Sequence, residues 1–133
     1  MDNVSLGSLS YLRAYGGRSL HNQSHGESFM ALFTNKLHGN GIYLFDEPEA
    51  ALSPLRQMAA LRAIHHLVLD QSQFVIATHS PILLAYPNAT IIRFDESGIS
   101  EIKYEETEHY TITREFLNNY RQRVDHLLRD DAE

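Results

Sequence analysis

An unbroken apolar run, Ile42–Phe45, is followed at once by two carboxylates, Asp46 and Glu47. Such a short apolar run bounded by turn residues is typical of a strand buried on both faces in a parallel sheet. Because burying carboxylates in a core carries a large desolvation cost, we expect Asp46 and Glu47 at the carboxyl end of this strand. Open α/β sheets bind their ligands at that end.

A helical pattern follows this strand. Ser53-Pro54 predicts the N-cap and first residue of a helix. Apolar positions then recur at steps of three and four, which predicts an amphipathic helix of about four turns. The residues of this predicted stripe are Leu55, Met58, Leu61, Ile64 or His65, and Val68.

A second apolar run, Phe74–Ala77, predicts another strand, which ends in Thr78-His79-Ser80. A strand, a helix and a strand at this spacing indicate a βαβ unit with parallel strands. The polar ends of both strands then meet at one edge of the sheet. We therefore expect His79 to lie near Asp46 and Glu47.

The flanking segments carry weaker patterns. Ser24, with Glu27 three residues later, predicts a capping box at the start of a helix. A helix end that contains Gly26 is suited to binding phosphate, although a plain capped helix explains the same residues. After the βαβ unit the pattern predicts a hairpin from Thr90–Phe94 and Ile99–Tyr104, a solvated charge run and a final helix. The charge run is Glu105–His109 and the final helix is Thr113–Leu128. Short helices at Ser8–Ala14 and Ile82–Ala85 and an acidic tail complete the expected elements.

Composition limits the classes of function. The chain has 133 residues, enough for a single domain over residues 1–133, and no run near the ~18 apolar residues that span a membrane. Cysteine is absent, which fits a cytoplasmic protein. The net charge of −6 and the presence of only two lysines argue against direct nucleic-acid binding by this chain. The eight histidines match no metal-ligand spacing.

Adjacent carboxylates at the end of a buried strand suit a magnesium nucleotide. Asp46 would hold the ion, and Glu47 would orient and deprotonate an attacking water. Taken alone, an apolar run followed by Asp-Glu is common and is better explained as a solvated strand end. The other motifs in the chain change that balance.

Four motifs in order resemble those of an ABC-type ATPase, in the branch of predicted ATPases (AAA ATPase domain) related to chromosome-maintenance and DNA-repair proteins. The resemblance covers roughly residues 17–110. Leu44–Pro48 is similar to the Walker B strand with its catalytic glutamate, and Ala50–Ser53 to the D-loop. Ala77–Ser80 is similar to the switch or H-loop, and Ser24–Glu27 to the signature motif.

The resemblance implies an α/β fold, a partial P-loop NTPase with a mostly parallel sheet, flanking helices, and a C-terminal β-hairpin and helix. It implies ATP and Mg²⁺ as ligands, and a homodimer whose signature motifs each meet the partner's nucleotide. The residues implied are Glu47 and His79 as catalytic, Asp46 as the metal ligand, and Ser24, His25, Gly26, Glu27 and Ser53 as nucleotide-binding.

The chain also departs from the family pattern. His25 replaces a signature glycine, Glu27 a glutamine, and Ser53 the usual D-loop aspartate. The Walker A and Q-loop motifs are missing from these residues, so the chain is expected to be the C-terminal half of the domain and to need a partner segment. A non-catalytic dimerisation module that keeps the scaffold is an open alternative, and a nucleic-acid-associated regulatory ATPase is a third.

Overall fold

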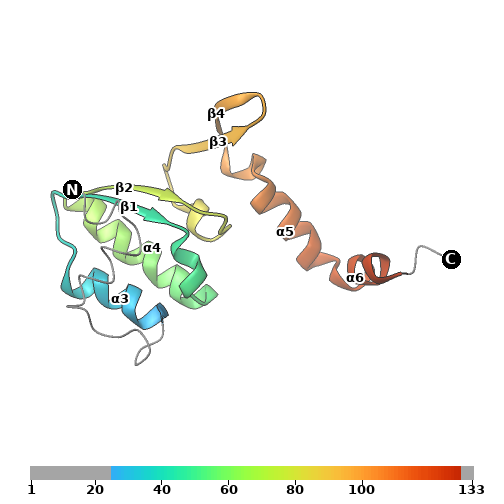
Figure 1. The fold of residues 1–133 in the computed structure, drawn as a ribbon, viewed down its shortest axis with the longest axis horizontal. Helices are drawn as coiled ribbons and strands as arrows, with labels where there is room; N and C mark the ends of the chain where they lie inside the picture. The colour runs from blue at the N-terminus through green and yellow to red at the C-terminus, as the bar shows by residue number, and fades with distance from the viewer. Residues whose placement is uncertain (1–24, 130–133) are drawn as a thin grey trace. The chain divides into compact units, whose positions relative to one another are not determined.

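A computed structural model describes residues 25–129, with side chains from Phe29 onward, and its contacts divide the chain into two compact units. The first unit runs to Tyr86 and the second starts at Pro87. The described elements of the first unit are α3 (His25–Asn35), β1 (Ile42–Asp46), η2 (Pro48–Ala51), α4 (Pro54–Leu69), β2 (Gln73–Ala77) and η3 (Leu83–Ala85) (Figure 1). Those of the second unit are β3 (Ile91–Asp95), β4 (Gly98–Ile102), η4 (Tyr104–Glu106), α5 (Glu108–Asn118) and α6 (Tyr120–Leu128).

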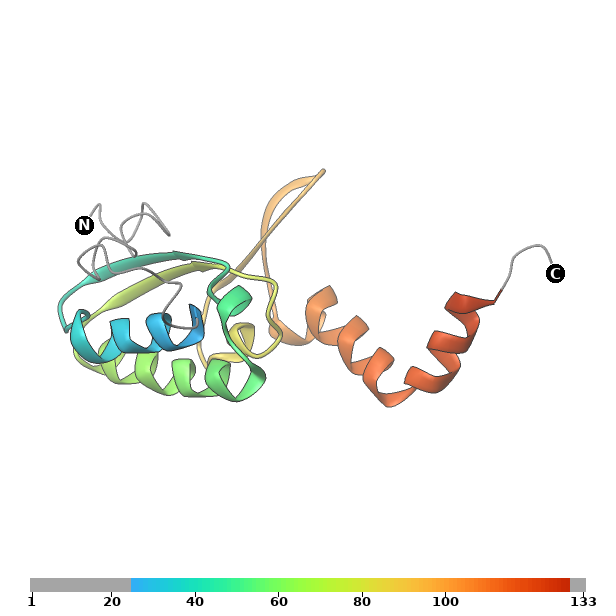
Figure 2. The same ribbon diagram turned by 60° about the horizontal axis from the view of Figure 1, so that its bottom comes forward.

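In the first unit, β1 and β2 are parallel neighbours, as predicted. Their register pairs Ile42 with Gln73 at one end and Asp46 with Ala77 at the other. Helix α4 connects them, and α3 and α4 lie on the same face of the strand pair (Figure 2). The predicted cap of α4 is confirmed, since the Ser53 Oγ accepts a hydrogen bond from the Arg56 N–H at 3.2 Å.

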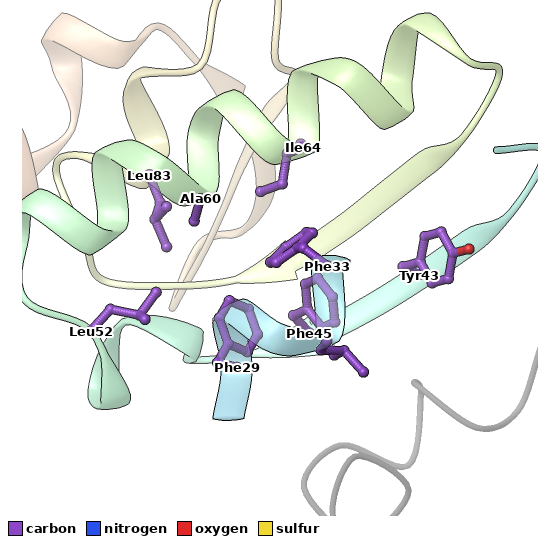
Figure 3. Close-up of a cluster of buried hydrophobic side chains, with 9 residues drawn as sticks. Phe29, Phe33, Tyr43, Phe45, Leu52, Ala60, Ile64 and Leu83 are labelled. Carbon is purple, nitrogen blue, oxygen red and sulfur yellow. The ribbon is translucent and has the colours of Figure 1, made fainter. Parts of the chain in front are cut away.

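The core lies between this strand pair and the helices, and aromatic rings fill its centre (Figure 3). The Phe45 ring meets those of Phe29 and Phe33 edge to face, with centroid separations of 5.3 and 5.9 Å. Edge-to-face contacts add to the stabilisation from apolar burial. The strand residue directly before Asp46 is therefore anchored. The buried apolar residues of this core are Phe29, Leu32, Phe33, Tyr43, Phe45, Leu52, Ala60, Ile64 and Leu83.

The outer face of the strand pair is open, so the expectation that β1 is buried on both faces is wrong. Tyr43 and Phe45 are buried, whereas Ile42 is 49% exposed and Val75 on β2 is 53% exposed. Successive strand side chains point to opposite faces. The helices of the described part cover one face only, which explains why alternate residues are buried in an apolar run.

The buried face of α4 agrees with the predicted stripe only in part, since Ile64 is buried and Leu61 and Val68 pack against the core, but the first two positions do not. Leu55 and Met58 are 77% and 56% exposed, whereas Ala60 and Ile64 are buried. At 100° per residue, Leu55 and Met58 lie roughly opposite Ile64 on the helix. The prediction followed the larger apolar side chains, but the core contact is made around a small one, Ala60.

The second unit opens with an antiparallel hairpin, as predicted. Its register runs from Ile91 with Ile102 to Asp95 with Gly98, and Gly98 takes φ +120°, a conformation that favours glycine. The Asp95 carboxylate accepts hydrogen bonds from the Ser97 hydroxyl and N–H, and these bonds hold the pKa of Asp95 below its usual value. The hairpin forms a sheet of its own, so the described strands make one parallel and one antiparallel pair.

The C-terminal helical region begins earlier than predicted and is broken in two. The charge run is not a loop: η4 spans its start, and α5 begins at Glu108 because the Thr107 Oγ1 accepts a hydrogen bond from the Tyr110 N–H at 3.1 Å. At Asn119 the backbone leaves helical geometry, with φ −134°. The single helix expected over Thr113–Leu128 is therefore replaced by α5 and α6.

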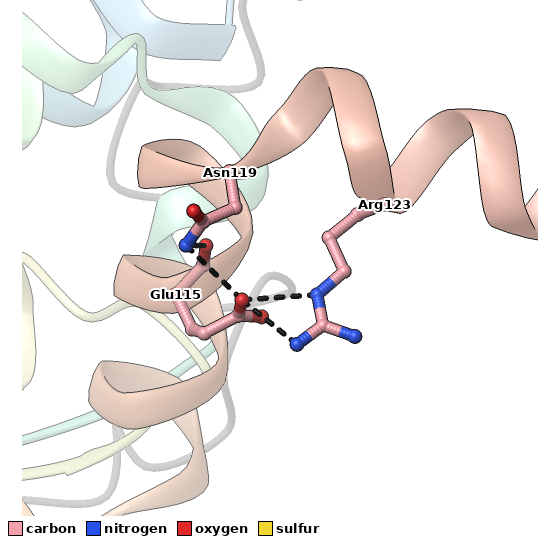
Figure 4. Close-up of polar contacts among 3 residues, drawn as sticks. All are labelled: Glu115, Asn119 and Arg123. Carbon is pink, nitrogen blue, oxygen red and sulfur yellow. Dashed lines mark hydrogen bonds and ion pairs between the residues drawn. The ribbon is translucent and has the colours of Figure 1, made fainter.

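One side-chain cluster fixes the corner between α5 and α6 (Figure 4). The Glu115 carboxylate accepts hydrogen bonds from the Asn119 Nδ2 at 3.1 Å and the Arg123 Nε at 2.9 Å. Arg123 also forms an ion pair with Glu115 through Nη2 at 2.8 Å. The side chains are largely exposed, so the cluster orients the corner more than it stabilises the fold.

Replacing Thr107 by alanine is expected to destabilise the second unit by about 0.5–2 kcal/mol, because α5 loses its N-cap. Thr107 is buried and its hydroxyl also donates to the Tyr104 carbonyl at 2.8 Å. Urea unfolding followed by far-UV circular dichroism measures the change. Thr113→Ala in the same helix is the control, because the Thr113 side chain caps nothing and forms no hydrogen bond among the described residues. Equal losses in both variants would contradict the assigned cap.

Two predicted segments, the helix at Ser8–Ala14 and the acidic tail at 130–133, lie outside the described residues. Within residues 25–129, no helix combines the length and apolar content needed to cross a bilayer. The single-domain organisation stays a prediction.

Candidate functional site at the carboxyl ends of β1 and β2

The parallel register brings the predicted site residues to one end of the strand pair. Asp46 is the last residue of β1 and lies opposite Ala77, the last residue of β2. The Glu47 N–H then donates to the Ala77 carbonyl at 2.7 Å, which extends the pairing one step past Asp46. The chain leaves β2 directly into Thr78 and His79. Asp46, Glu47 and His79 therefore come from adjacent segments, and all three are exposed.

Glu47 takes an unusual backbone conformation. Its φ of 50° and ψ of 55° place it in the left-handed region, where a residue with a Cβ costs about 1–3 kcal/mol. Its carbonyl accepts a hydrogen bond from the Ala50 N–H at 3.1 Å, so Glu47 turns the chain from β1 into η2. Strained residues of this kind concentrate at functional sites.

Glu49, which the sequence pattern did not single out, connects the two strand exits. Its Oε1 accepts a hydrogen bond from the Thr78 hydroxyl at 2.6 Å, and its Oε2 accepts one from the His79 N–H at 2.9 Å. The only signal in the sequence is a third carboxylate close to Asp46 and Glu47. Its partners lie about thirty residues away, as the separation of 29 residues from Thr78 shows.

Ser80 anchors the segment that contains His79. Its hydroxyl is buried, donates to the Gln57 Oε1, and accepts from the N–H groups of Ile82 and Leu83 at 3.1 and 3.0 Å. Gln57 in turn donates to the Leu52 carbonyl at 3.1 Å. The segment is therefore held from both sides, by Glu49 before Ser80 and by α4 at Ser80.

The carboxylates of the site differ in whether they already accept hydrogen bonds. Both Glu49 oxygens are engaged by donors. The side chains of Asp46 and Glu47 are exposed and make no hydrogen bond or ion pair with any residue in 25–129. Because both Glu49 oxygens already hold donors, Asp46 and Glu47 are the carboxylates available to an ion or a water.

The donors present fit Mg²⁺ bound together with phosphate. Mg²⁺ is usually held by one or two carboxylates, with waters and substrate phosphates completing its shell. Asp46 supplies such an oxygen at the strand end. In the part of the chain that the structure describes, no cluster of three or more acidic or histidine side chains is arranged to hold a metal by itself. The ligands present therefore fit an ion held jointly by Asp46 and the phosphates of a bound nucleotide, rather than an ion held by protein side chains alone.

The structure describes only some of the predicted nucleotide-binding residues. Helix α3 begins at His25, so the predicted helix is present, while Ser24 and the side chains of His25 and Glu27 lie outside the described part, and of Gly26 only its place in the helix is described. Ser53 is exposed, and its hydroxyl caps α4. Contacts of these residues with a nucleotide stay a prediction.

In comparisons with protein-family models and with curated proteins, none matched this chain. The functional assignment therefore rests on the residues and their arrangement.

Proposed function

We propose that this chain is the C-terminal part of an ABC-type ATPase domain, and that it binds and hydrolyses ATP when a Walker A segment is supplied to it. The observation that supports the proposal best is the parallel register of β1 and β2. It brings an Asp-Glu pair and a Thr-His-Ser segment to the same edge of the sheet. A carboxylate for Mg²⁺ and a residue that orients the attacking water are parts that phosphoryl transfer uses, and α/β sheets bind ligands at the carboxyl ends of their strands.

Each residue has a distinct role in the proposed reaction. Asp46 would hold Mg²⁺, which would neutralise charge on the phosphates. Glu47 orients a water and accepts its proton as the water attacks the terminal phosphorus. His79 donates a hydrogen bond to the terminal phosphate, where negative charge is concentrated.

Two further features support this assignment. The left-handed backbone of Glu47 is costly and is explained if it directs the carboxylate toward a substrate. The open outer face, with Ile42 and Val75 half exposed, fits a parallel sheet whose second face is covered by helices that the described part of the chain does not supply. The same open face supports the expectation of a homodimer or a partner chain.

The chain by itself is expected neither to bind Mg-ATP at micromolar concentration nor to release phosphate at an enzymatic rate. Most of the affinity for a triphosphate comes from a Walker A lysine and its loop, which these residues do not contain. Calorimetry with Mg-ATP and a phosphate-release assay measure both quantities. The same assays are repeated with a segment that carries a Gly-Lys-Ser/Thr loop, fused before the chain or added as a second protein.

We call the chain together with this added Walker A segment the complemented protein. ATP hydrolysis by the complemented protein, and not by the chain alone, supports the proposal. Tight binding and steady release by the chain alone would show that the Walker A segment is dispensable. Nucleotide binding by the complemented protein without any turnover would favour the non-catalytic dimerisation module instead.

A further inference from the structure

We infer that Glu49 is a positioning residue, which holds the Thr78–His79 segment in place relative to Glu47; this inference rests on the proposed function. Two backbone N–H groups, one from each segment, donate hydrogen bonds between the exit of β1 and the exit of β2. The Glu47 N–H donates to the Ala77 carbonyl at 2.7 Å, and the His79 N–H donates to the Glu49 Oε2 at 2.9 Å. From the first bond to the second, the chain advances by two residues in each segment, from Glu47 to Glu49 and from Ala77 to His79.

This second bond continues the strand pairing with a side chain in place of a backbone carbonyl. The ladder between β1 and β2 ends at Asp46 and Ala77. Past Glu47, whose N–H donates to the Ala77 carbonyl, η2 turns away, and the next bonds between the two segments are made by the Glu49 side chain. The Glu49 side chain extends from η2 to Thr78 and His79 and accepts a hydrogen bond from each. Glu49 is therefore the side chain that ties the Thr78–His79 segment to the exit of β1, while Ser80 ties the same segment to α4.

The chemistry of the contact requires a carboxylate of this length. Two donors, the Thr78 hydroxyl and the His79 N–H, converge on the two oxygens of Glu49. An ionised carboxylate accepts at both oxygens, and bonds to a charged acceptor are stronger than neutral ones. Glutamine keeps the length and one acceptor oxygen, aspartate keeps the charge but is shorter by one methylene, and alanine keeps neither.

Glu49 does not act on substrate in this scheme, because its oxygens already hold two donors. Its effect passes through His79. Small displacements of a positioned group can cost about 10²-fold in rate. Loss of Glu49 is therefore expected to lower kcat more than it raises KM.

The first test uses the chain alone and needs no ATPase activity. Amide hydrogen exchange, followed by NMR, reports the His79 N–H. In Glu49→Ala its exchange is expected to rise by about tenfold or more, because a bond to a charged acceptor is lost. Glu96→Ala is the matched control, an exposed carboxylate in the hairpin turn. Unchanged His79 exchange in Glu49→Ala would overturn the inference.

The second test is a double-mutant cycle in the complemented protein. Glu49→Ala is expected to lower kcat by about 10–100-fold, with Glu49→Gln between it and the wild type. In a His79→Ala background, Glu49→Ala is expected to cost less than about twofold, because residues that act as one unit are not additive. A residue that merely stabilised the fold would reduce activity in both backgrounds.

The possible failures are separable. Wild-type turnover with fully additive losses from Glu49→Ala and His79→Ala would overturn the positioning role alone. Absence of Glu47-dependent turnover in the wild-type complemented protein would overturn the proposed function, and the positioning role with it.

Discussion

Replacing Glu47 by glutamine is expected to lower the rate of ATP hydrolysis by the complemented protein by about 10²–10⁴-fold, with little change in its affinity for Mg-ATP. Glutamine has the length of glutamate and can still orient a water, but it cannot take a proton from it. The exposed Glu47 side chain makes no hydrogen bond within residues 25–129, so the substitution disturbs no described contact of that side chain. Single-turnover phosphate release measures the chemical step, and equilibrium binding measures the affinity.

Glu96→Gln serves as the control for this substitution. It changes the same functional group at an exposed position of the hairpin turn and is expected to leave both quantities within a factor of two. Turnover of Glu47→Gln within a few-fold of the wild type would remove Glu47 from the catalytic role. A parallel loss of affinity and rate would instead indicate that Glu47 contributes to nucleotide binding.

Replacing Leu32 by alanine is expected to destabilise the first unit by about 2–5 kcal/mol, because the substitution removes buried volume from the centre of the core. Leu32 is 3% exposed and belongs to the cluster around Phe45. A cost of this size is a large part of the stability of a small domain. Urea unfolding, followed through NMR signals of the first unit, measures the difference.

Leu55→Ala provides a control with the same chemical change in the same unit. Leu55 is 77% exposed near the start of α4, and its truncation is expected to alter stability by no more than about 0.5 kcal/mol. Similar losses in the two variants would show that the core does not lie where the structure places it.

Local patterns predicted the elements that carry the site. Two apolar runs, each followed by polar residues, were sufficient for β1 and β2, and Ser53-Pro54 was sufficient for the start of α4. The parallel pairing followed from the strand–helix–strand order, so the common edge of Asp46 and His79 was predictable. These features depend on residues close together in sequence or on a general rule of chain connection.

Features that depend on tertiary contacts were not predictable in the same way. The helix α4 turns Ala60 toward the core, although Leu55 and Met58 have the stronger apolar signal. Glu49 acquires its role only when the folded chain brings Thr78 and His79 to it. The break at Asn119 interrupts a pattern whose apolar spacing fits one helix as well as two.

The two strand pairs differ in how soon their partner strands become available while the chain is being synthesised. Each residue of β1 pairs with one that lies 31 positions further along, from Ile42 with Gln73 to Asp46 with Ala77. At about 5–20 residues per second, a ribosome needs roughly 2–6 s to add that length of chain. Throughout that interval the apolar strand Ile42–Phe45 has no β2 to pair with, whereas the pairs of the β3–β4 hairpin, from Asp95 with Gly98 to Ile91 with Ile102, are at most 11 positions apart. Slowed translation through α4 is therefore expected to lengthen the exposure of β1 on the nascent chain and to leave the hairpin unaffected.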